Sequence, residues 1–417
     1  MSRGIALLTT LLLGSFTWGQ STTLPEPRWR AFLITFSPGP ALWERFGHNA
    51  LLIYDSQLDR NYCYDFGNFD FEQPGFLRRF ILRQMLYSAE RKDVEQLLSE
   101  YRLQNRQITG QSLQLSSDQA EQLWRNLELN VREDRKFYAY DYYQDNCSTR
   151  IRDHLDRVTH GALRAALESL PTGTTYRHHT RLGLAYQPLL LAGVDFLLST
   201  PADRTLSAWE ECFLPERLAA HVRTVKLDGA ALVLSERQMN PYLDETRLIR
   251  VPAREPPLLA WGGGLGLVIG VALASCGLVA DRSAVGRGLA GAVWAGWGLL
   301  AGVAGSLLLL MWLLTDHRAT YANLNLLLVS PLSLAWLVLG PLAARGRAVE
   351  ASRWLAAGLV AMAILAIVIK GIGGSRQENW PIAAFALPAT MGMLAGVVVC
   401  CRGARLLKRG SPDEQDH

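Results

Sequence analysis

The sequence has 417 residues and a formal net charge of only +4 at pH 7. It contains no basic tract interleaved with aromatic residues, which argues against nucleic-acid binding. Composition changes sharply near residue 257, from a charged, aromatic-rich part to long apolar runs separated by short basic loops. The sequence therefore predicts an integral membrane protein with a soluble N-terminal part.

The first residues have the pattern of a secretory signal. Arg3 precedes an apolar run from Ile5 to Phe16, and small residues lie near Gly19. Such a pattern predicts that residues 1–19 direct export, with either cleavage after Gly19 or retention as an anchor. The following part, residues 20–257, is then expected to be exported.

The exported part has three cysteines, Cys63, Cys147 and Cys212. In an oxidising compartment Cys63 and Cys212 could form a disulfide and leave Cys147 free, although sequence alone does not fix the pairing. These cysteines lack a CxxC spacing, so a cysteine-based zinc site is not expected. We predict no metal and no cofactor.

The sequence is most informative in residues 138–158, YAYDYYQDNCSTRIRDHLDRV. Apolar residues recur at helical spacing behind Cys147, so Asn146 is predicted to cap a helix that begins at Cys147. Free amides at a helix start favour a thiolate and can hold an oxyanion during acyl transfer. Tyr143, in the aromatic run before the cysteine, is a candidate substrate contact. Alternatively, Cys147 is a small buried structural residue.

Residues 29–56 predict two strands joined by a Pro-Gly-Pro turn, and residues 62–69 predict a third strand in a hairpin with the second. His48 opens the second strand, which places Asp65 and Asn68 on its neighbour. Either side chain could orient the imidazole, and Asp65 is the better candidate because a carboxylate also stabilises an imidazolium. A satisfied core histidine is the alternative, but the combination with a capped cysteine favours catalysis.

Other segments predict supporting elements. Residues 74–88 predict a basic amphipathic helix that covers the sheet or lies on the membrane, and residues 117–131 predict a capped helix. A further strand is expected within residues 89–110, a helix over residues 205–220 and a hairpin around Asp228-Gly229. The run TYRHHTRLG is either a solvated loop or a phosphate-binding cluster, with the residues Arg177, His178, His179 and Arg181.

Five apolar segments are each long enough to cross a bilayer: 258–280, 289–314, 324–344, 354–370 and 381–401. If the soluble part is outside, the loops that carry most of the basic residues are on the cytoplasmic side, as is usual for membrane proteins. Residues 402–417 are then expected to form a cytoplasmic tail. The loop 315–325 is then outside. Its polar residues either contact substrate or belong to a plain interfacial loop: Asp316, His317, Asn323 and Asn325.

The order of His48 before Cys147 is similar to that of the circularly permuted NlpC-type group, which includes lecithin:retinol acyltransferase. More closely, the segments GHNALLIYD, YDFGNFDF and YQDNCSTRIRD resemble the periplasmic domain of the Lnb family of bacterial lipoprotein N-acyltransferases. The resemblance covers most of residues 30–160 and extends to the multi-span tail. It implies an α+β, permuted papain-like (NlpC-type) periplasmic domain fused to an all-α bundle of five transmembrane helices.

The resemblance also implies a reaction at the bacterial inner membrane, with the catalytic domain on the periplasmic side. The enzyme would take an acyl chain from a membrane phospholipid, hold it as a thioester and pass it to the free N-terminal amine of a diacylated lipoprotein. Cys147 would be the nucleophile, His48 its base and Asp65 the residue that orients His48. Asn146 would help shape the oxyanion site.

In the outer loop, the resemblance implies that His317, Asn323 and Asn325 steer the substrate headgroup or amine. Two rival functions stay open. The same dyad would serve a membrane-anchored periplasmic cysteine peptidase or amidase acting on cell-wall peptides. A non-catalytic membrane assembly or binding protein would use Cys147 only structurally.

Overall fold

The computed structural model describes residues 27–409, except 71, 73–74, 76–77, 80–81, 83 and 241–242, and it describes side chains as far as residue 400. The predicted signal, residues 1–19, and the second half of the predicted tail, residues 410–417, therefore lie outside the described residues. The chain forms two compact units. The sheet unit comprises residues 1–174 and 205–251, and the helical unit comprises residues 175–204 and 252–417.

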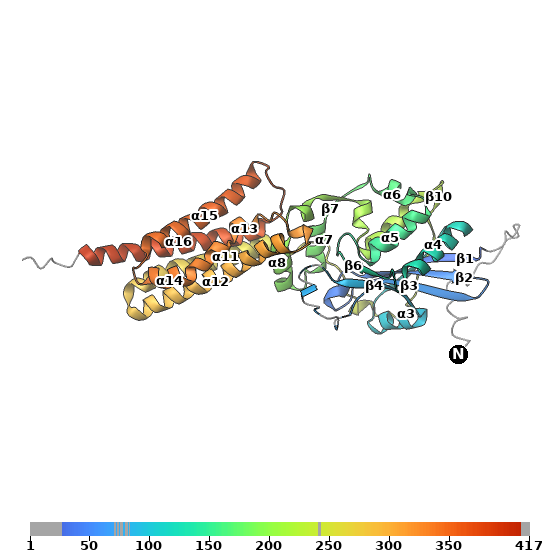
Figure 1. Ribbon diagram of the computed structural model, residues 1–417, viewed down its shortest axis with the longest axis horizontal. Coiled ribbons are helices and arrows are strands. Elements are labelled where there is room, and N and C mark those ends of the chain that lie inside the picture. Colours follow the sequence, from blue (N-terminus) through green and yellow to red (C-terminus); the bar gives the residue numbers. More distant parts are fainter. Residues whose placement is uncertain are drawn as a thin grey trace, which may run out of the picture. The chain divides into compact units, whose positions relative to one another are not determined.

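A seven-stranded sheet forms the centre of the sheet unit (Figure 1). Its strand order is β11-β5-β1-β2-β3-β4-β6, and every neighbouring pair is antiparallel. The predicted hairpin is confirmed, with Ala50 of β2 opposite Asp65 of β3. The strands are β1 (Trp29–Phe36), β2 (His48–Asp55), β3 (Arg60–Asn68), β4 (Leu86–Lys92), β5 (Ile108–Leu113), β6 (Phe137–Ala139) and β11 (Val233–Gln238).

Helices cover both faces of this sheet (Figure 1). On one face, α3 (Val94–Leu103) packs against β3 and β5. On the other lie α4 (Ser117–Asn130), α5 (Cys147–Val158) and α10 (Pro215–Thr224), with α6 (Ala162–Leu167) and α9 (Ala208–Glu211) beside them. Two small two-stranded sheets complete the unit: β7 (Pro171–Thr175) with β8 (Thr205–Ser207), and β9 (Lys226–Leu227) with β10 (Ala230–Ala231).

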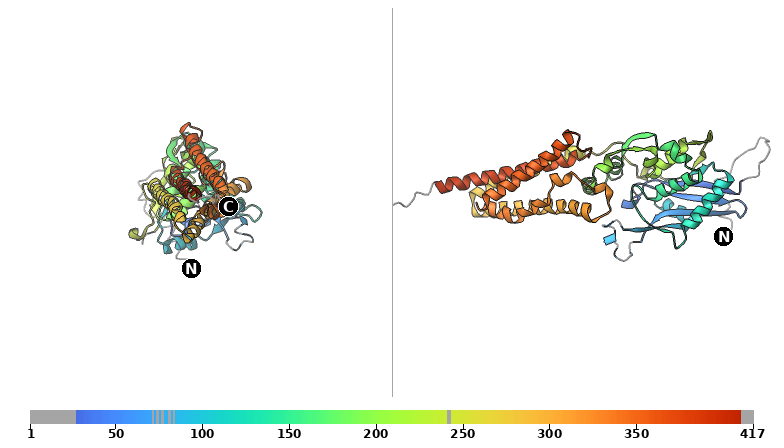
Figure 2. Two further views of the ribbon diagram at one scale, coloured as in Figure 1. Left: turned by 90° about the vertical axis from the view of Figure 1, so that its left-hand side faces the viewer. Right: turned by 45° about the horizontal axis from the view of Figure 1, so that its top comes forward.

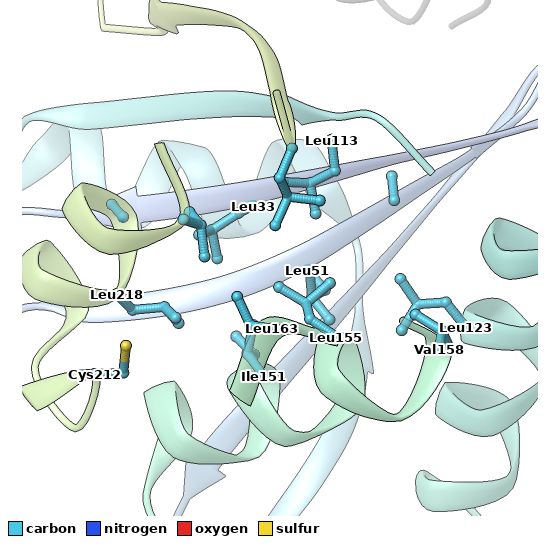
Figure 3. Packing of buried hydrophobic residues seen from close by; sticks show 14 of the residues in the cluster. Leu33, Leu51, Leu113, Leu123, Ile151, Leu155, Val158, Leu163, Cys212 and Leu218 are labelled. Atoms are coloured by element: carbon cyan, nitrogen blue, oxygen red, sulfur yellow. The ribbon is translucent and has the colours of Figure 1, made fainter. Parts of the chain in front are cut away.

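Alternate strand residues enter two hydrophobic cores because side chains on a strand alternate between faces. Leu33 and Leu51 pack against Ile151 and Leu155 of α5 (Figure 3), whereas Phe32 and Leu52 pack on the α3 side. Each fully buried side chain of this kind contributes about 1.5–3 kcal/mol to folding. The cores thereby fix the position of the α5 start against the sheet.

The two cores also exclude the disulfide that the sequence left open. Cys63 lies in the core on the α3 side and Cys212 in the core on the α5 side, and both are free thiols. Burial raises the pKa of the Cys212 thiol to about 12 and also raises the pKa of Cys63. Neither thiol is therefore poised to react.

Several local predictions are confirmed. The capped helix over 117–131 is α4, with Ser116 and Gln119 forming a capping box, and the hairpin at Asp228-Gly229 joins β9 to β10. The helix expected over 74–88 is wrong at its end, because residues from Leu86 form β4 and pair with β3. Residues 74, 76–77, 80–81 and 83 of that segment lie outside the described residues.

Five helical segments of the helical unit are long and apolar enough to cross a membrane. They are α11 (Leu258–Arg282), α12 (Ala284–Leu314), a third span over Asn325–Ala344, α15 (Val349–Gly371) and α16 (Trp380–Arg409, apolar to Cys400). They run alongside one another in both views of Figure 2. The third span is interrupted: α13 (Asn325–Leu328) is followed by a 3-10 turn η5 (Pro331–Ala335) and α14 (Trp336–Ala344).

Backbone-to-backbone packing joins the first span to the last. A Cβ atom placed on Gly266 or Gly277 of α11 would lie 2.4 or 2.2 Å from the backbone oxygen of Phe385 or Gly396 of α16. Only a residue without a side chain permits this approach. Small residues are the usual means of close helix packing in a membrane, where lipid is as apolar as the side chains.

The remaining helices of this unit are α7 (Tyr176–Gly183), α8 (Pro188–Leu197) and the 3-10 turns η2 (Thr200–Asp203) and η4 (Arg318–Thr320). Residues 175–204 thus pack with the spans and not with the sheet. The division into an exported catalytic part, residues 20–257, and a membrane part, residues 258–401, remains a prediction.

Candidate active site

Cys147 is the first residue of α5, as predicted. The side-chain oxygen of Asn146 accepts hydrogen bonds from the amides of Ser148, at 2.9 Å, and Thr149, at 3.0 Å. The amide group of Asn146 donates to the backbone oxygens of Tyr142 and Phe213. Because its oxygen and its nitrogen are both engaged, Asn146 positions the cysteine and does not present a free donor to a substrate.

His48 begins β2 and lies between an acid and the thiol. Its Nε2 is 2.5 Å from Oδ1 of Asp65, and its ring stacks with those of Phe36 and Tyr101. The other oxygen of Asp65 is 2.7 Å from Nζ of Lys92 on β4. Burial disfavours the Asp65 carboxylate, but His48 and Lys92 outweigh it and lower the pKa of Asp65 from 3.8 to about 2.

Cys147 and His48 form a charged pair. Burial opposes ionisation of both groups. The imidazolium nevertheless lowers the pKa of the Cys147 thiol, with which it hydrogen-bonds, and the backbone N–H of Asn49 adds a second hydrogen bond to the sulfur. Conversely, Cys147 and Asp65 raise the pKa of His48 from 6.5 to about 10. The geometry therefore favours thiolate and imidazolium at neutral pH.

A buried hydrogen-bond chain fixes α5 against β2. Ser148 Oγ donates to Oδ1 of Asn49 at 2.7 Å, and Nδ2 of Asn49 donates to Oγ1 of Thr35 at 2.8 Å. Ser148 and Asn49 are both fully buried. Since Asn49 follows His48 and Ser148 follows Cys147, this contact aligns the two reactive side chains. The sequence analysis missed it, because the partners are 99 residues apart.

Gly67 and Tyr138 border the thiol. Gly67 has a φ of +89° at a β-bulge in β3, and a Cβ atom placed on it would lie 3.8 Å from Cβ of Cys147 and 4.0 Å from the hydroxyl of Tyr138. Tyr138 on β6 is buried, and its hydroxyl has no hydrogen-bond partner among the described residues. The Arg150 guanidinium stacks on its ring at 3.4 Å. The Tyr138 hydroxyl is thus an unpartnered donor on the same side of Gly67 as Cys147.

Two other predicted contacts have local partners. The Asn68 side chain donates to the backbone oxygens of Asp65, at 3.2 Å, and Ser88, at 3.4 Å, so it braces the bulge and leaves His48 to Asp65. Tyr143 is buried with its ring edge-on to Phe213 at 5.4 Å. Neither arrangement assigns a substrate contact, and both residues remain predictions for binding.

The predicted outer-loop residues belong to the helical unit. Asn323 and Asn325 are buried, and their amides donate to backbone oxygens at the end of α8, at 2.9 Å to Leu197 and 2.7 Å to Phe196. Their own oxygens accept from Gln377 and Asn379. This network joins three segments of the unit. His317 is half-buried beside η4.

The segment TYRHHTRLG is helix α7, so the expected solvated loop is wrong. Arg177 is 1% exposed and is ion-paired with Asp195 and Asp203, while Arg181 is ion-paired with Asp195 and Glu255. With these guanidinium groups held by carboxylates, the arrangement does not support the phosphate cluster either. Throughout the described part of the chain, no three metal-binding side chains are grouped.

Two family models match the chain. The model of the Lnb N-terminal periplasmic domain matches residues 20–181, and the model of the Lnb transmembrane domain matches residues 288–397. His48, Asp65 and Cys147 all lie within the first match. No curated protein and no solved structure gives a significant match. The permuted papain-like topology has no counterpart in these findings and stays a prediction.

Proposed function

This chain belongs to the Lnb family, as a membrane protein with a periplasmic N-terminal domain, and we propose that it is a thiol-dependent lipoprotein N-acyltransferase. The observation that carries the proposal is the position of Cys147 at a capped helix start, hydrogen-bonded to His48, whose imidazole Asp65 holds. Such a pair divides acyl transfer into two steps through a thioester. The donor we propose is a membrane phospholipid, and the acceptor is a diacylated lipoprotein in the inner membrane.

In the first step, the sulfur of Cys147 attacks the ester carbonyl of the phospholipid, and the S–C bond forms. The C–O ester bond then breaks, and His48 gives its proton to the departing lysophospholipid oxygen. The backbone N–H of Cys147 and the Tyr138 hydroxyl hold the negative charge on the carbonyl oxygen, because the Ser148 and Thr149 amides already donate to Asn146. Asp65 keeps the imidazole oriented throughout.

In the second step, the N-terminal amine of the lipoprotein attacks the thioester carbonyl. The C–S bond breaks, the amide forms, and His48 accepts a proton from the amine nitrogen while the thiolate of Cys147 is restored. An acceptor amine competes with water for the same thioester. The same dyad acting on the amide bond of a cell-wall peptide, with water as the acceptor, would give the rival peptidase or amidase activity.

The test uses bacterial cells that lack their own N-acyltransferase. Expression of the full chain should convert diacylated lipoprotein to the N-acylated form, detected by mass spectrometry of its N-terminal peptide. Cys147→Ser should abolish the conversion, and trapped wild-type protein should carry an acyl adduct on Cys147. Cys212→Ser is the matched control, because this thiol is buried in the core. The proposal would be contradicted if the lipoprotein stayed entirely diacylated in cells whose membranes contain the protein. Release of cell-wall peptides would favour the rival function.

A further inference from the structure

A cavity of about 520 Å³ lies within the helical unit. Its walls come from α8, from the spans α11, α12, α15 and α16, and from the interrupted third span. The lining is almost entirely apolar and includes Trp261, Leu265, Trp297, Trp336, Phe385 and Met393. This volume falls within the range of about 300–1,000 Å³ that small-molecule sites occupy.

The position of the walls identifies the kind of occupant. Five of the six wall elements belong to segments long and apolar enough to cross a bilayer. A chamber at that depth is surrounded by hydrocarbon, and water gains few hydrogen bonds against such a lining. A saturated alkyl chain fits these walls without leaving a polar group unpaired.

The end of the cavity formed by α8 is fixed in place. Phe196 lines the cavity, and its backbone oxygen accepts the hydrogen bond from Asn325. The Asn323 amide donates to the next backbone oxygens, and Gln377 donates to Leu198. Because α8 is held by buried hydrogen bonds, the chamber does not have to form when a ligand arrives.

A series of ion-paired side chains begins at the cavity wall. Asp195 lines the cavity, and Arg181 Nε is 2.7 Å from its Oδ1. Arg181 also contacts Glu255 at 3.0 Å, and Glu255 contacts His178 at 2.6 Å. His178 and Glu255 are about one-third exposed, so this series of ion pairs reaches solvent. An apolar chamber with ion-paired polar side chains at one end matches an amphiphile whose apolar chain enters the chamber and whose polar end stays outside it.

We propose that this cavity holds one acyl chain of a membrane phospholipid, with the headgroup outside the apolar lining. The inference rests on the proposed function only in treating the phospholipid as the acyl donor. It assigns to the five spans the binding of the donor, a role that a membrane anchor alone would not need.

The test uses the full chain in nanodiscs that contain a phospholipid with a diazirine in one acyl chain. After illumination, mass spectrometry should locate most cross-links on cavity-lining residues of α8, α11 and α12. Ala304→Phe, which fills the lining, should reduce these cross-links at least about fivefold. Val303→Phe is the matched control, because Val303 is 54% exposed on the same helix and does not line the cavity. Equal labelling of both variants would overturn the proposal.

A second variant guards against a folding defect. Gly193 of α8 lines the cavity, and a Cβ atom placed on it meets no atom within 4 Å. Gly193→Leu should therefore reduce cross-linking without loss of folded protein. Cys147→Ser should retain cross-linking, which separates failure of lipid binding from failure of catalysis. If a diacylated lipopeptide competes for the cavity as well as unlabelled phospholipid does, the bound acyl chain belongs to the acceptor. That result would overturn the choice of the donor as occupant.

Discussion

The substitution Asp65→Asn tests how far the carboxylate sustains the charged pair. It preserves the shape of the side chain but removes the charge that lies 2.5 Å from His48 and 2.7 Å from Lys92. The imidazolium loses its counter-charge, and the ammonium of Lys92 is no longer neutralised and repels it. Both changes favour the neutral imidazole, so the proton returns from His48 to the thiolate of Cys147.

The expected magnitude follows from the contacts. The pKa of His48 rises from 6.5 to about 10 through Cys147 and Asp65 together, against the opposing effect of burial. This rise corresponds to roughly 5 kcal/mol at about 1.4 kcal/mol per pKa unit. Of this free energy, one hydrogen bond to a charged group accounts for about 1.5–3 kcal/mol. Its loss changes an equilibrium constant by a factor of about 10 to 150. Asp65→Asn should lower the thiolate population at pH 7 by a factor in that range.

The assay is the rate of Cys147 alkylation by iodoacetamide, measured by mass spectrometry from pH 5 to pH 11. Asp65→Asn should slow the reaction at least about tenfold at neutral pH. The two proteins should converge at high pH, where the thiol ionises without the imidazolium. Asp59→Asn is the matched control, since Asp59 contacts Tyr54 at the exposed end of the same hairpin. An unchanged rate, or equal slowing by both substitutions, would refute the reasoning.

Other substitutions test the remaining contacts. Tyr138→Phe should leave stability nearly unchanged, because the hydroxyl has no described partner, and should slow thioester formation by about 10²–10³ in a lysophospholipid-release assay. Asn146→Ala should lower the free energy of unfolding by about 0.5–2 kcal/mol through loss of the cap, and further because two backbone carbonyls lose their hydrogen-bond donor. An unchanged melting temperature would refute the role of Asn146 as a cap. Gly277→Ala should cost about 1–3 kcal/mol in detergent unfolding, and Gly296→Ala, where an added Cβ meets no atom within 4 Å, should not. Because its folded pKa is raised, His48 should stabilise the fold fully below about pH 6.5, and this contribution should disappear as the pH rises through about 10, which unfolding at a series of pH values would show.

Local sequence patterns were sufficient to place Cys147 at a helix start and Asp65 on the strand beside His48. The Asn146 cap involves residues only two and three positions away, and the hairpin that brings Asp65 next to His48 closes over a short turn. Helix starts and hairpins are specified by neighbouring residues, so a single sequence predicts them well. The five spans were equally legible, because each is one continuous apolar run.

Partners that are distant in the sequence could not be predicted. Lys92 reaches Asp65 only because β4 pairs with β3, whereas the sequence predicted a helix up to residue 88 and a strand of unspecified position and pairing within residues 89–110. Tyr138 enters the site because β6 adds to the far edge of the sheet. Asn323 was expected at the membrane surface, but α8, more than a hundred residues earlier in the chain, buries it. These pairings depend on tertiary packing and leave no periodic signal.

The glycine contacts between α11 and α16 also constrain how the protein is made. During synthesis α11 is made well before α16, which forms the surface that α11 packs against. Until then its glycines face lipid or a substitute partner, and the bundle cannot close. Packing of α11 against its partner surface must therefore wait until α16 has entered the membrane, and a chain that stops before α16 leaves the glycine surface of α11 unpaired.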